Sequence, residues 1–387
     1  MKKTLAAMAV LGAFAGTTMA ADVTLYGVVD LGLKYTRVDS DKAGESATNK
    51  LEMASGNQSG ARFGLKGAED LGNGMKVGFV LENGFSADDG KLGNAGRLFG
   101  REAILYVDGG FGQVAFGRTG QLTSYNGSYG LIGGLSPFGA SWGGTPELST
   151  YMVGNSRIDN TVTYKTPTFA GVNLYAQYSF DMNNAEDLED AYRVKKVEGQ
   201  ATAYRYAALG ATYKGGALNL VATADYYNWS SARYVNGDVD DGFSVTAGGN
   251  FDFGVAKAYL GVQYFDNMFK TTSAKDQKDT FAKIGTGVDG QLKGYGVIAG
   301  VDAPVLGGTA MFAVGYNDAK TTADVTDKAE AQRWGVGVGY TYALSKRTNL
   351  YGVAGDYQDK IENEGNVKGE DRDPSNTMFV VGMRHKF

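Results

Sequence analysis

Few side chains in this sequence could carry out covalent chemistry. Its 387 residues include no Cys and one His, His385, which lies two positions from the last residue. Acid–base and nucleophilic catalysis usually depend on a His beside a Ser or an Asp. In an alternating strand, His385 would share a face with Phe387 and Met383, which is an apolar face rather than a catalytic one. We therefore expect no enzymatic activity.

Two short motifs resemble ligand sites, and neither has the surroundings that such a site requires. Residues Gly285–Gly290 have the glycine spacing of a dinucleotide-binding loop, but no βαβ pattern surrounds them. Residues Asp238–Gly242 resemble a calcium loop with its glycine out of place and no closing Glu. We expect no cofactor and no resident metal ion, although the acidic loops could bind divalent cations loosely.

Basic residues flank the longest weakly charged connector. Between Arg118 and Arg157 lie 38 residues, of which Glu147 is the only charged one, and they include Phe138 and Trp142. Such a long apolar loop would be unusual in water, so the pattern favours burial of this loop against the rest of the protein. An outer loop that shields a subunit contact is the alternative.

The first twenty residues have the pattern of a secretory signal peptide. Met1–Lys3 is basic, Thr4–Ala15 is uncharged and mostly apolar, and Gly16–Ala20 offers small residues for cleavage after Ala20. The apolar run is too short for a membrane-spanning helix. We therefore predict a signal peptide over residues 1–20 and a mature domain over residues 21–387.

Composition predicts an all-β chain. There are 58 Gly, 24 Tyr, 19 Phe and 5 Pro, and the formal net charge is −5. Frequent Gly is costly in helices, and no later run of 18 apolar residues is present. Without Cys, an exported chain cannot be held by disulfides, so its stability must come from a large closed structure.

Two kinds of connector alternate along the mature chain. Seven are short and rich in Gly, Asp or Pro, and we interpret them as tight turns: 69–74, 109–112, 166–171, 215–216, 252–254, 302–308 and 344–348. Eight are longer and mostly polar or charged: 37–48, 87–96, 119–157, 181–203, 229–242, 267–290, 318–331 and 358–375. The alternation predicts sixteen antiparallel strands.

The strands have one apolar and one mixed face. In the closing segment, Phe379, Val381, Met383, His385 and Phe387 share one face, opposite a face that includes Arg384 and Lys386. Taken alone, this segment could also be a half-buried strand of a soluble β-sandwich. With an export signal, lipid on one side and water on the other is favoured, and lipid forbids free sheet edges. The expected fold is a transmembrane sixteen-stranded antiparallel β-barrel with short periplasmic turns and long extracellular loops.

Six short motifs, in order, resemble those of the Gram-negative trimeric general porins of the betaproteobacterial type. They are Asp22–Gly27, Gly60–Gly74, Phe99–Ala103, Phe111–Arg118, Leu344–Thr348 and Gly382–Phe387. The resemblance implies a homotrimer in the outer membrane that passes ions and small hydrophilic solutes. It also implies that the third long loop folds inward as a pore constriction, and that Phe387 is read by the barrel assembly machinery. Outer-membrane lipid and lipopolysaccharide are expected partners, and nucleic acid is not.

The resemblance also directs attention to basic residues near the third loop. Arg62 and Lys66 should face the lumen, whereas Arg101 and Arg118 have ambiguous parity. The expected constriction residues are Arg62, Lys66, Arg101, Arg118, Glu147 and Arg157. Ordinary ion pairs with Asp30, Glu82, Glu102 or Asp159 are the alternative for each Arg. We predict a general diffusion porin with weak anion preference; a sugar- or anion-selective channel and a surface adhesin anchored by the barrel are the alternatives.

Overall fold

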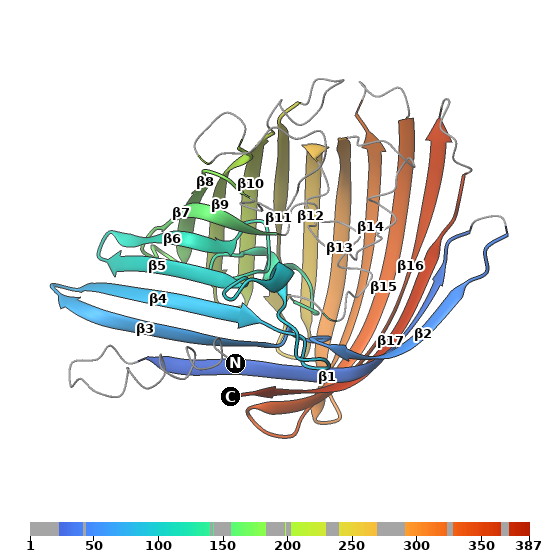
Figure 1. Ribbon diagram of the computed structural model, residues 1–387, viewed down its shortest axis with the longest axis horizontal. Helices are drawn as coiled ribbons and strands as arrows, with labels where there is room; N and C mark the ends of the chain where they lie inside the picture. Colours follow the sequence, from blue (N-terminus) through green and yellow to red (C-terminus); the bar gives the residue numbers. More distant parts are fainter. Residues whose placement is uncertain are drawn as a thin grey trace, which may run out of the picture.

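The computed structural model describes residues 23–41, 44–139, 142, 156–182, 198, 203–229, 240–268, 291–322, 328–364 and 371–387. Within these ranges, seventeen strand segments form one closed antiparallel sheet (Figure 1). Their bounds are β1 Thr24–Asp39, β2 Thr48–Ser55, β3 Arg62–Gly72, β4 Met75–Gly84, β5 Glu102–Gly109, β6 Gly112–Gly120, β7 Arg157–Lys165, β8 Val172–Ser179, β9 Arg205–Gly215, β10 Leu218–Asn228, β11 Gly242–Asp252, β12 Lys257–Met268, β13 Leu292–Val305, β14 Gly308–Thr321, β15 Lys328–Ala343, β16 Thr348–Glu364 and β17 Ser375–Lys386. Two 3-10 turns, η1 (Asn94–Gly96) and η2 (Ile132–Leu135), lie between strands. No helix in the described ranges is both long and apolar enough to span a membrane.

The seventeen segments occupy sixteen positions in the barrel wall. Along one edge, β1 pairs first with β3 (Thr24 opposite Lys66) and then with β2 (Val38 opposite Thr48). Because β2 and β3 follow one another along β1, they are one wall strand interrupted at residues 56–61. The predicted sixteen-stranded antiparallel barrel is confirmed.

The barrel closes between its first and last strands. The other edge of β1 pairs with β17, from Val28 opposite Lys386 to Asp39 opposite Ser375. Gly27 and Phe387 then exchange two backbone hydrogen bonds of 3.0 and 3.1 Å. Each of the sixteen wall positions is thereby paired on both sides over at least part of its length, which is the condition for a sheet in lipid; the β2 segment itself pairs with β1 alone.

Short and long connectors alternate as the sequence predicts. The β3–β4 turn shows why its residues form a tight connection: Gly72, Asn73 and Gly74 have φ angles of 79°, 52° and 74°. Gly and Asn adopt this left-handed region most readily. The carboxylate of Asp70 also accepts a hydrogen bond of 2.8 Å from the Gly72 N–H. Because consecutive strands are antiparallel, the tight turns gather at one rim and the long loops at the other.

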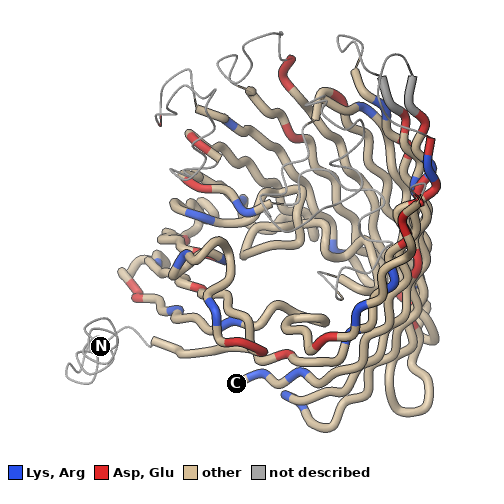
Figure 2. Tube along the Cα trace, turned by 45° about the vertical axis from the view of Figure 1, so that its right-hand side comes forward, with Lys and Arg blue, Asp and Glu red and all other residues tan. Residues whose placement is uncertain are grey.

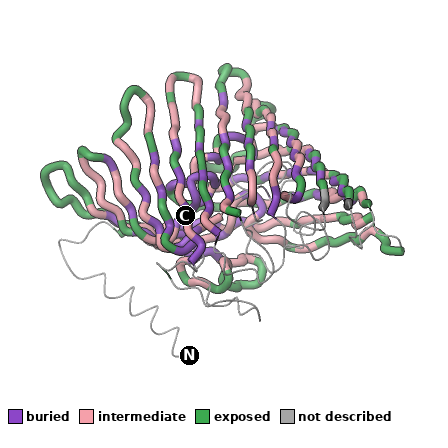
Figure 3. The backbone as a smooth tube through the Cα atoms, turned by 90° about the horizontal axis from the view of Figure 1, so that it is seen from above, coloured by how far each residue is buried: buried purple, intermediate pink, exposed green. Residues whose placement is uncertain are grey.

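Along strands such as β10, β14 and β17, inward and outward residues differ in exposure as predicted (Figure 3). On β17, Phe379, Val381 and Met383 are about half exposed, whereas Met378 and Val380 are buried. On β15, the outward Trp334 is exposed and the inward Arg333 is buried. Outward apolar side chains in a closed barrel face lipid, so the soluble-sandwich alternative does not apply.

The wall strands differ in length around the barrel (Figure 1). Strands β4 to β8 have 8–10 residues, and β13 to β16 have 14–17. The buried apolar residues form two clusters made largely of inward-facing wall residues and residues of the connector between β6 and β7. That connector therefore supplies much of the core of the molecule.

Candidate functional site

The third long loop, the connector between β6 and β7, lies inside the barrel. Of this loop, residues 121–139, 142 and 156 are described. Leu135 is completely buried, and Ile132, Phe138 and Trp142 are 1–5% exposed. They pack against inward residues of β10, β13, β14, β16 and β17: Val221, Ile298, Met311, Ala313, Tyr351, Val353, Met378 and Val380. The predicted inward-folded third loop is confirmed.

Glycines on the inner wall make room for the loop. At five inward positions a Cβ atom would lie 2.6–3.2 Å from a loop side chain: Gly210 against Leu131, Gly248 and Gly261 against Leu135, Gly300 against Pro137, and Gly339 against Phe138. Contacts under 3.0 Å are too close for a real Cβ, so side chains at most of these positions would push the loop away. We call the lumen side of β9–β16 the docking wall.

Polar contacts hold the beginning of the loop. The hydroxyl of Thr123 donates to the Asp225 carboxylate, which also accepts from Tyr206. The Leu122 N–H donates to Gln177 Oε1 at 3.1 Å. These groups are buried, so each contact satisfies a polar atom that would otherwise be costly to bury.

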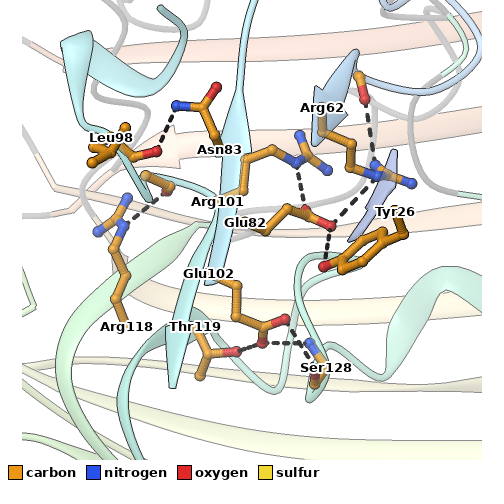
Figure 4. A network of polar contacts seen from close by, with 12 residues as sticks. Tyr26, Arg62, Glu82, Asn83, Leu98, Arg101, Glu102, Arg118, Thr119 and Ser128 are labelled. Carbon is orange, nitrogen blue, oxygen red and sulfur yellow. Dashed lines mark hydrogen bonds and ion pairs between the residues drawn. The ribbon is translucent and has the colours of Figure 1, made fainter. Parts of the chain in front are cut away.

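Glu102 fixes the same loop from the opposite side (Figure 4). Its carboxylate accepts from the Thr119 hydroxyl at 2.7 Å, and from the N–H and hydroxyl of Ser128 at 2.7 and 2.9 Å. Tyr129 donates to Gln113 at 2.6 Å, and burial raises the pKa of its hydroxyl, which keeps it a donor. The loop is therefore attached on both sides of the barrel.

Basic residues lie along the wall formed by β3–β7 (Figure 2), whose lumen side we call the arginine wall, and Figure 4 shows the guanidinium groups of Arg62, Arg101 and Arg118 there. Arg101 Nε donates to Glu82 Oε1 at 2.7 Å, and Arg62 Nε lies 3.5 Å from Glu82 Oε2. Tyr26 donates to the same carboxylate at 3.0 Å. Arg157 interacts electrostatically with Arg101 and Glu82, and its Nε is buried without a hydrogen-bond partner. We call Arg62, Arg101 and Arg157 the arginine group.

Positive charge in the arginine group exceeds the negative charge beside it. Arg62 and Arg101 share the single carboxylate of Glu82, and Arg157 lies near enough to interact with that carboxylate electrostatically. The described part of the third loop has no charged residue that could balance them. At a few ångströms and reduced dielectric, such a surplus attracts anions. Across the described residues, no group of three or more metal-ligating side chains is arranged to hold a metal ion.

Two other expected site residues, Lys66 and Arg118, form no ion pair with Glu82 among the described residues, although Arg118 is near enough to Arg157 to interact with it electrostatically. Lys66 is exposed on β3 with its ammonium 5.4 Å from the centre of the Tyr26 ring. Arg118 donates to Gly100 O at 2.9 Å and pairs with Asp159 at 2.5 Å, and Arg97 shares that carboxylate. Glu147 lies outside the described residues.

Backbone irregularities explain why strand parity left Arg118 ambiguous. The register of β6 with β7 shifts between Gly117 and Thr119, and Asn160 has a φ of 52°. An irregularity of this kind re-aims the side chains beside it. Arg101 lies just before β5, where strand parity does not apply.

Sequence reasoning did not assign a role to the inward residues Asp225 and Tyr351. Asp225 lies in a strand that alternates Val221, Thr223, Asp225 and Tyr227 on one face, so its inward direction could be predicted. Its contact with the third loop could not be, because that contact depends on the path of the loop across the lumen.

Known proteins similar to this chain agree with this geometry. A family model described as Gram-negative porin matches residues 6–362. The chain is 34% identical to an outer membrane porin protein of Bordetella pertussis and 30% identical to outer membrane porin protein 32 of Delftia acidovorans, each over the full length of both chains. Among solved structures, the anion-selective porin from Comamonas acidovorans is 25% identical, with a TM-score of 0.66 over 95% of this chain and 100% of that one.

Proposed function

Because the chain belongs to the Gram-negative porin family, and is therefore an outer-membrane channel protein, we propose that it is a general diffusion porin with a weak preference for anions. Ions and small hydrophilic solutes pass between the third loop and the arginine wall. Arg62, Arg101 and Arg157 form the charged side of the constriction, and Lys66 adds positive charge on the same wall. No step of this transport requires covalent chemistry.

The surplus of guanidinium groups around Glu82 is the observation that carries the proposal. Ions in a narrow aqueous pore pass fixed charges at short range, so a few uncompensated cations bias which ions enter. The description of the Comamonas acidovorans relative as anion-selective supports the same sign. Acidic stretches of the long loops, including residues 181–198 and 362–373, act in the opposite direction by attracting cations over a longer range.

Measurement of the reversal potential across a planar bilayer under a potassium chloride gradient tests this sign. At low salt, we expect an anion-to-cation permeability ratio moderately above one. The ratio should move toward that of free solution as salt increases, because screening shortens the reach of the fixed charges. A clear cation preference at low salt would overturn the assignment.

We also propose that the chain assembles as a homotrimer after cleavage behind Ala20, and that Phe387 takes part in recognition by the barrel assembly machinery. A trimer should insert into a bilayer with current levels that close in three steps. Intact-mass analysis of the protein from outer membranes should give the mass of residues 21–387. Single-step closures, or a mature chain that retains its first twenty residues, would contradict these proposals.

A further inference from the structure

We propose that residues 56–61, the interruption between β2 and β3, form a second structural element of the constriction, and that Asp30 is the residue that positions it. The proposal rests on the channel function above. It adds a part of the wall that shapes the opening, in addition to the third loop.

The interruption lies on the inner side of the wall. Asp30 is completely buried, and its Oδ2 accepts hydrogen bonds from the N–H groups of Gln58 and Ser59 at 2.8 and 2.7 Å. The side-chain oxygen of Gln58 accepts a 2.8 Å hydrogen bond from Asn349, an inward residue of β16. If residues 56–61 turned toward the outside of the barrel, they could not reach Asp30 or Asn349.

The length of the interruption distinguishes it from a β-bulge. A bulge inserts one extra residue into a ladder. Here six residues leave the pairing with β1, between Ser55 opposite Leu31 and Arg62 opposite Val28. Three of their N–H groups donate instead to Asp30: those of Gln58 and Ser59 to its carboxylate, and that of Gly56 to its backbone oxygen at 2.9 Å. Hydrogen bonds from N–H groups to a carboxylate are charge-assisted, so they can hold such a segment firmly.

One end of the interruption supports the arginine group. A guanidinium nitrogen of Arg62 donates to Gly60 O at 3.4 Å. A Cβ on Gly60 would lie 2.8 Å from a terminal nitrogen of Arg101, so that guanidinium lies directly against the Gly60 backbone. Together with Glu82, residues 56–61 therefore fix where two of the three positive charges lie.

The same carboxylate is connected to the third loop. Tyr351 donates to Asp30 Oδ1 at 2.5 Å, and its ring packs edge-to-face on Trp142, with 5.6 Å between ring centroids. Asp30 thus joins the interruption, β16 and, through Tyr351, the loop. A single buried side chain sets the spacing between the two sides of the opening.

Cysteine labelling tests whether the interruption lines the pore. Because the chain has no Cys, a Ser59→Cys variant carries one thiol. Reaction with charged methanethiosulfonate reagents should roughly halve the single-channel conductance. The anionic and cationic reagents should shift the permeability ratio in opposite directions. Leu33→Cys, on the exposed outward face of β1, is the control and should show neither effect.

Removal of the carboxylate tests the positioning role. Asp30→Ala should lower the anion-to-cation permeability ratio roughly twofold, because Arg62 and Arg101 lose their support; loss of the negative charge without movement of the arginines would raise the ratio instead. Tyr351→Phe retains the ring on Trp142 and removes only the hydroxyl, so it should give a smaller shift of the same sign. If Asp30→Ala does not assemble, the permeability ratio of Tyr351→Phe tests the proposal in its place. A residue that only stabilises the fold would reduce the yield of assembled protein and leave the ratio unchanged.

Specific results would overturn the inference. Complete labelling of Ser59→Cys, verified by mass, with unchanged current would show that the interruption does not line the opening. If assembled Asp30→Ala and Tyr351→Phe both keep the wild-type permeability ratio, Asp30 does not position the interruption. Failure of the proposed function is distinct, since it would appear in the wild-type protein as absent channels or a cation preference.

Discussion

Two parts of the inner wall bound the same opening and are held by different forces. On the arginine wall, guanidinium groups share too few carboxylates, as around Glu82. On the docking wall, Arg333 is neutralised by Asp359 through contacts of 2.5 and 2.8 Å, with both side chains about 1% exposed. There the third loop is held by apolar side chains against glycines. The difference teaches that charge and width depend mainly on different contacts: no ion pair in the described chain joins the loop to the arginine group, and Asp30 and Tyr351 connect the two sides only indirectly.

The largest expected effect is on width and comes from the docking wall. Trp142→Ala removes a buried ring that packs on Phe138 and Tyr351, at a cost of roughly 3–5 kcal/mol to loop docking. The loop should loosen, so single-channel conductance and the size limit for sugars in liposome swelling should both increase. The permeability ratio should change little.

Trp334→Ala is the matched control for this change. Trp334 lies on the outward face of β15 and is 47% exposed. Its conductance should equal that of the wild type. If Trp142→Ala also leaves conductance unchanged, the loop is not held by this contact, and the contrast between the two walls fails.

The second effect is on charge and comes from the arginine wall. Replacing Arg101 and Arg157 together by Gln removes two of three guanidinium groups. The anion-to-cation permeability ratio should fall several-fold, to one or below, while conductance stays within about a factor of two. Reversal potentials at low salt provide the measurement. Arg347→Gln, in the exposed β15–β16 turn, should keep the wild-type ratio.

A third variant changes a wall strand of the docking wall rather than the loop. Gly339→Leu places a Cβ where Cε1 of Phe138 is 2.6 Å away, so the loop must move into the lumen. Conductance should decrease by a modest fraction, opposite in sign to Trp142→Ala. A Cβ on Gly110, in the β5–β6 turn, would have no atom within 4 Å, so Gly110→Leu should keep the wild-type conductance. An increase in conductance for Gly339→Leu would contradict the close fit of loop and wall.

A smaller change in charge on the arginine wall tests the role of the Glu82 carboxylate. Glu82→Gln removes the carboxylate shared by Arg62 and Arg101 and keeps a hydrogen-bonding side chain. The permeability ratio should increase by roughly twofold, because the local positive surplus grows by one charge. Reversal potentials again provide the measurement. A decrease would mean that Glu82 mainly orders the arginines rather than screening them.

The smallest effect is expected at Arg118. Its partners are Gly100 O and Asp159, and among the described residues no ion pair joins it to Glu82. Arg118→Gln should therefore leave the permeability ratio within error of the wild type and slightly lower the unfolding temperature of the assembled protein. A loss of anion preference as large as that of the double variant would place Arg118 in the conducting path.

Strand number and side-chain faces could be predicted from the sequence, because alternation and turn residues are local properties. The interruption at residues 56–61 was not predicted, although the run Gly56-Asn57-Gln58-Ser59-Gly60 is polar and glycine-rich. A polar run inside a strand has no local signal that distinguishes a lumen-facing strand from a break. The contacts of Asp225 and Tyr351 depend on residues about a hundred or more positions away, which strand periodicity does not encode.

The closure of β1 on β17 also has a kinetic consequence. In the described chain, the other neighbouring pairs in the wall are consecutive strands, apart from β1–β3 across the interruption. Such hairpins can form early, because their loop-closure entropy is small. Pairing of β1 with β17 joins nearly opposite ends of the chain, so we expect it to be the slow step of folding. Until then, the backbone donors and acceptors at two strand edges are unsatisfied in lipid, so every open intermediate carries this cost and only closure removes it.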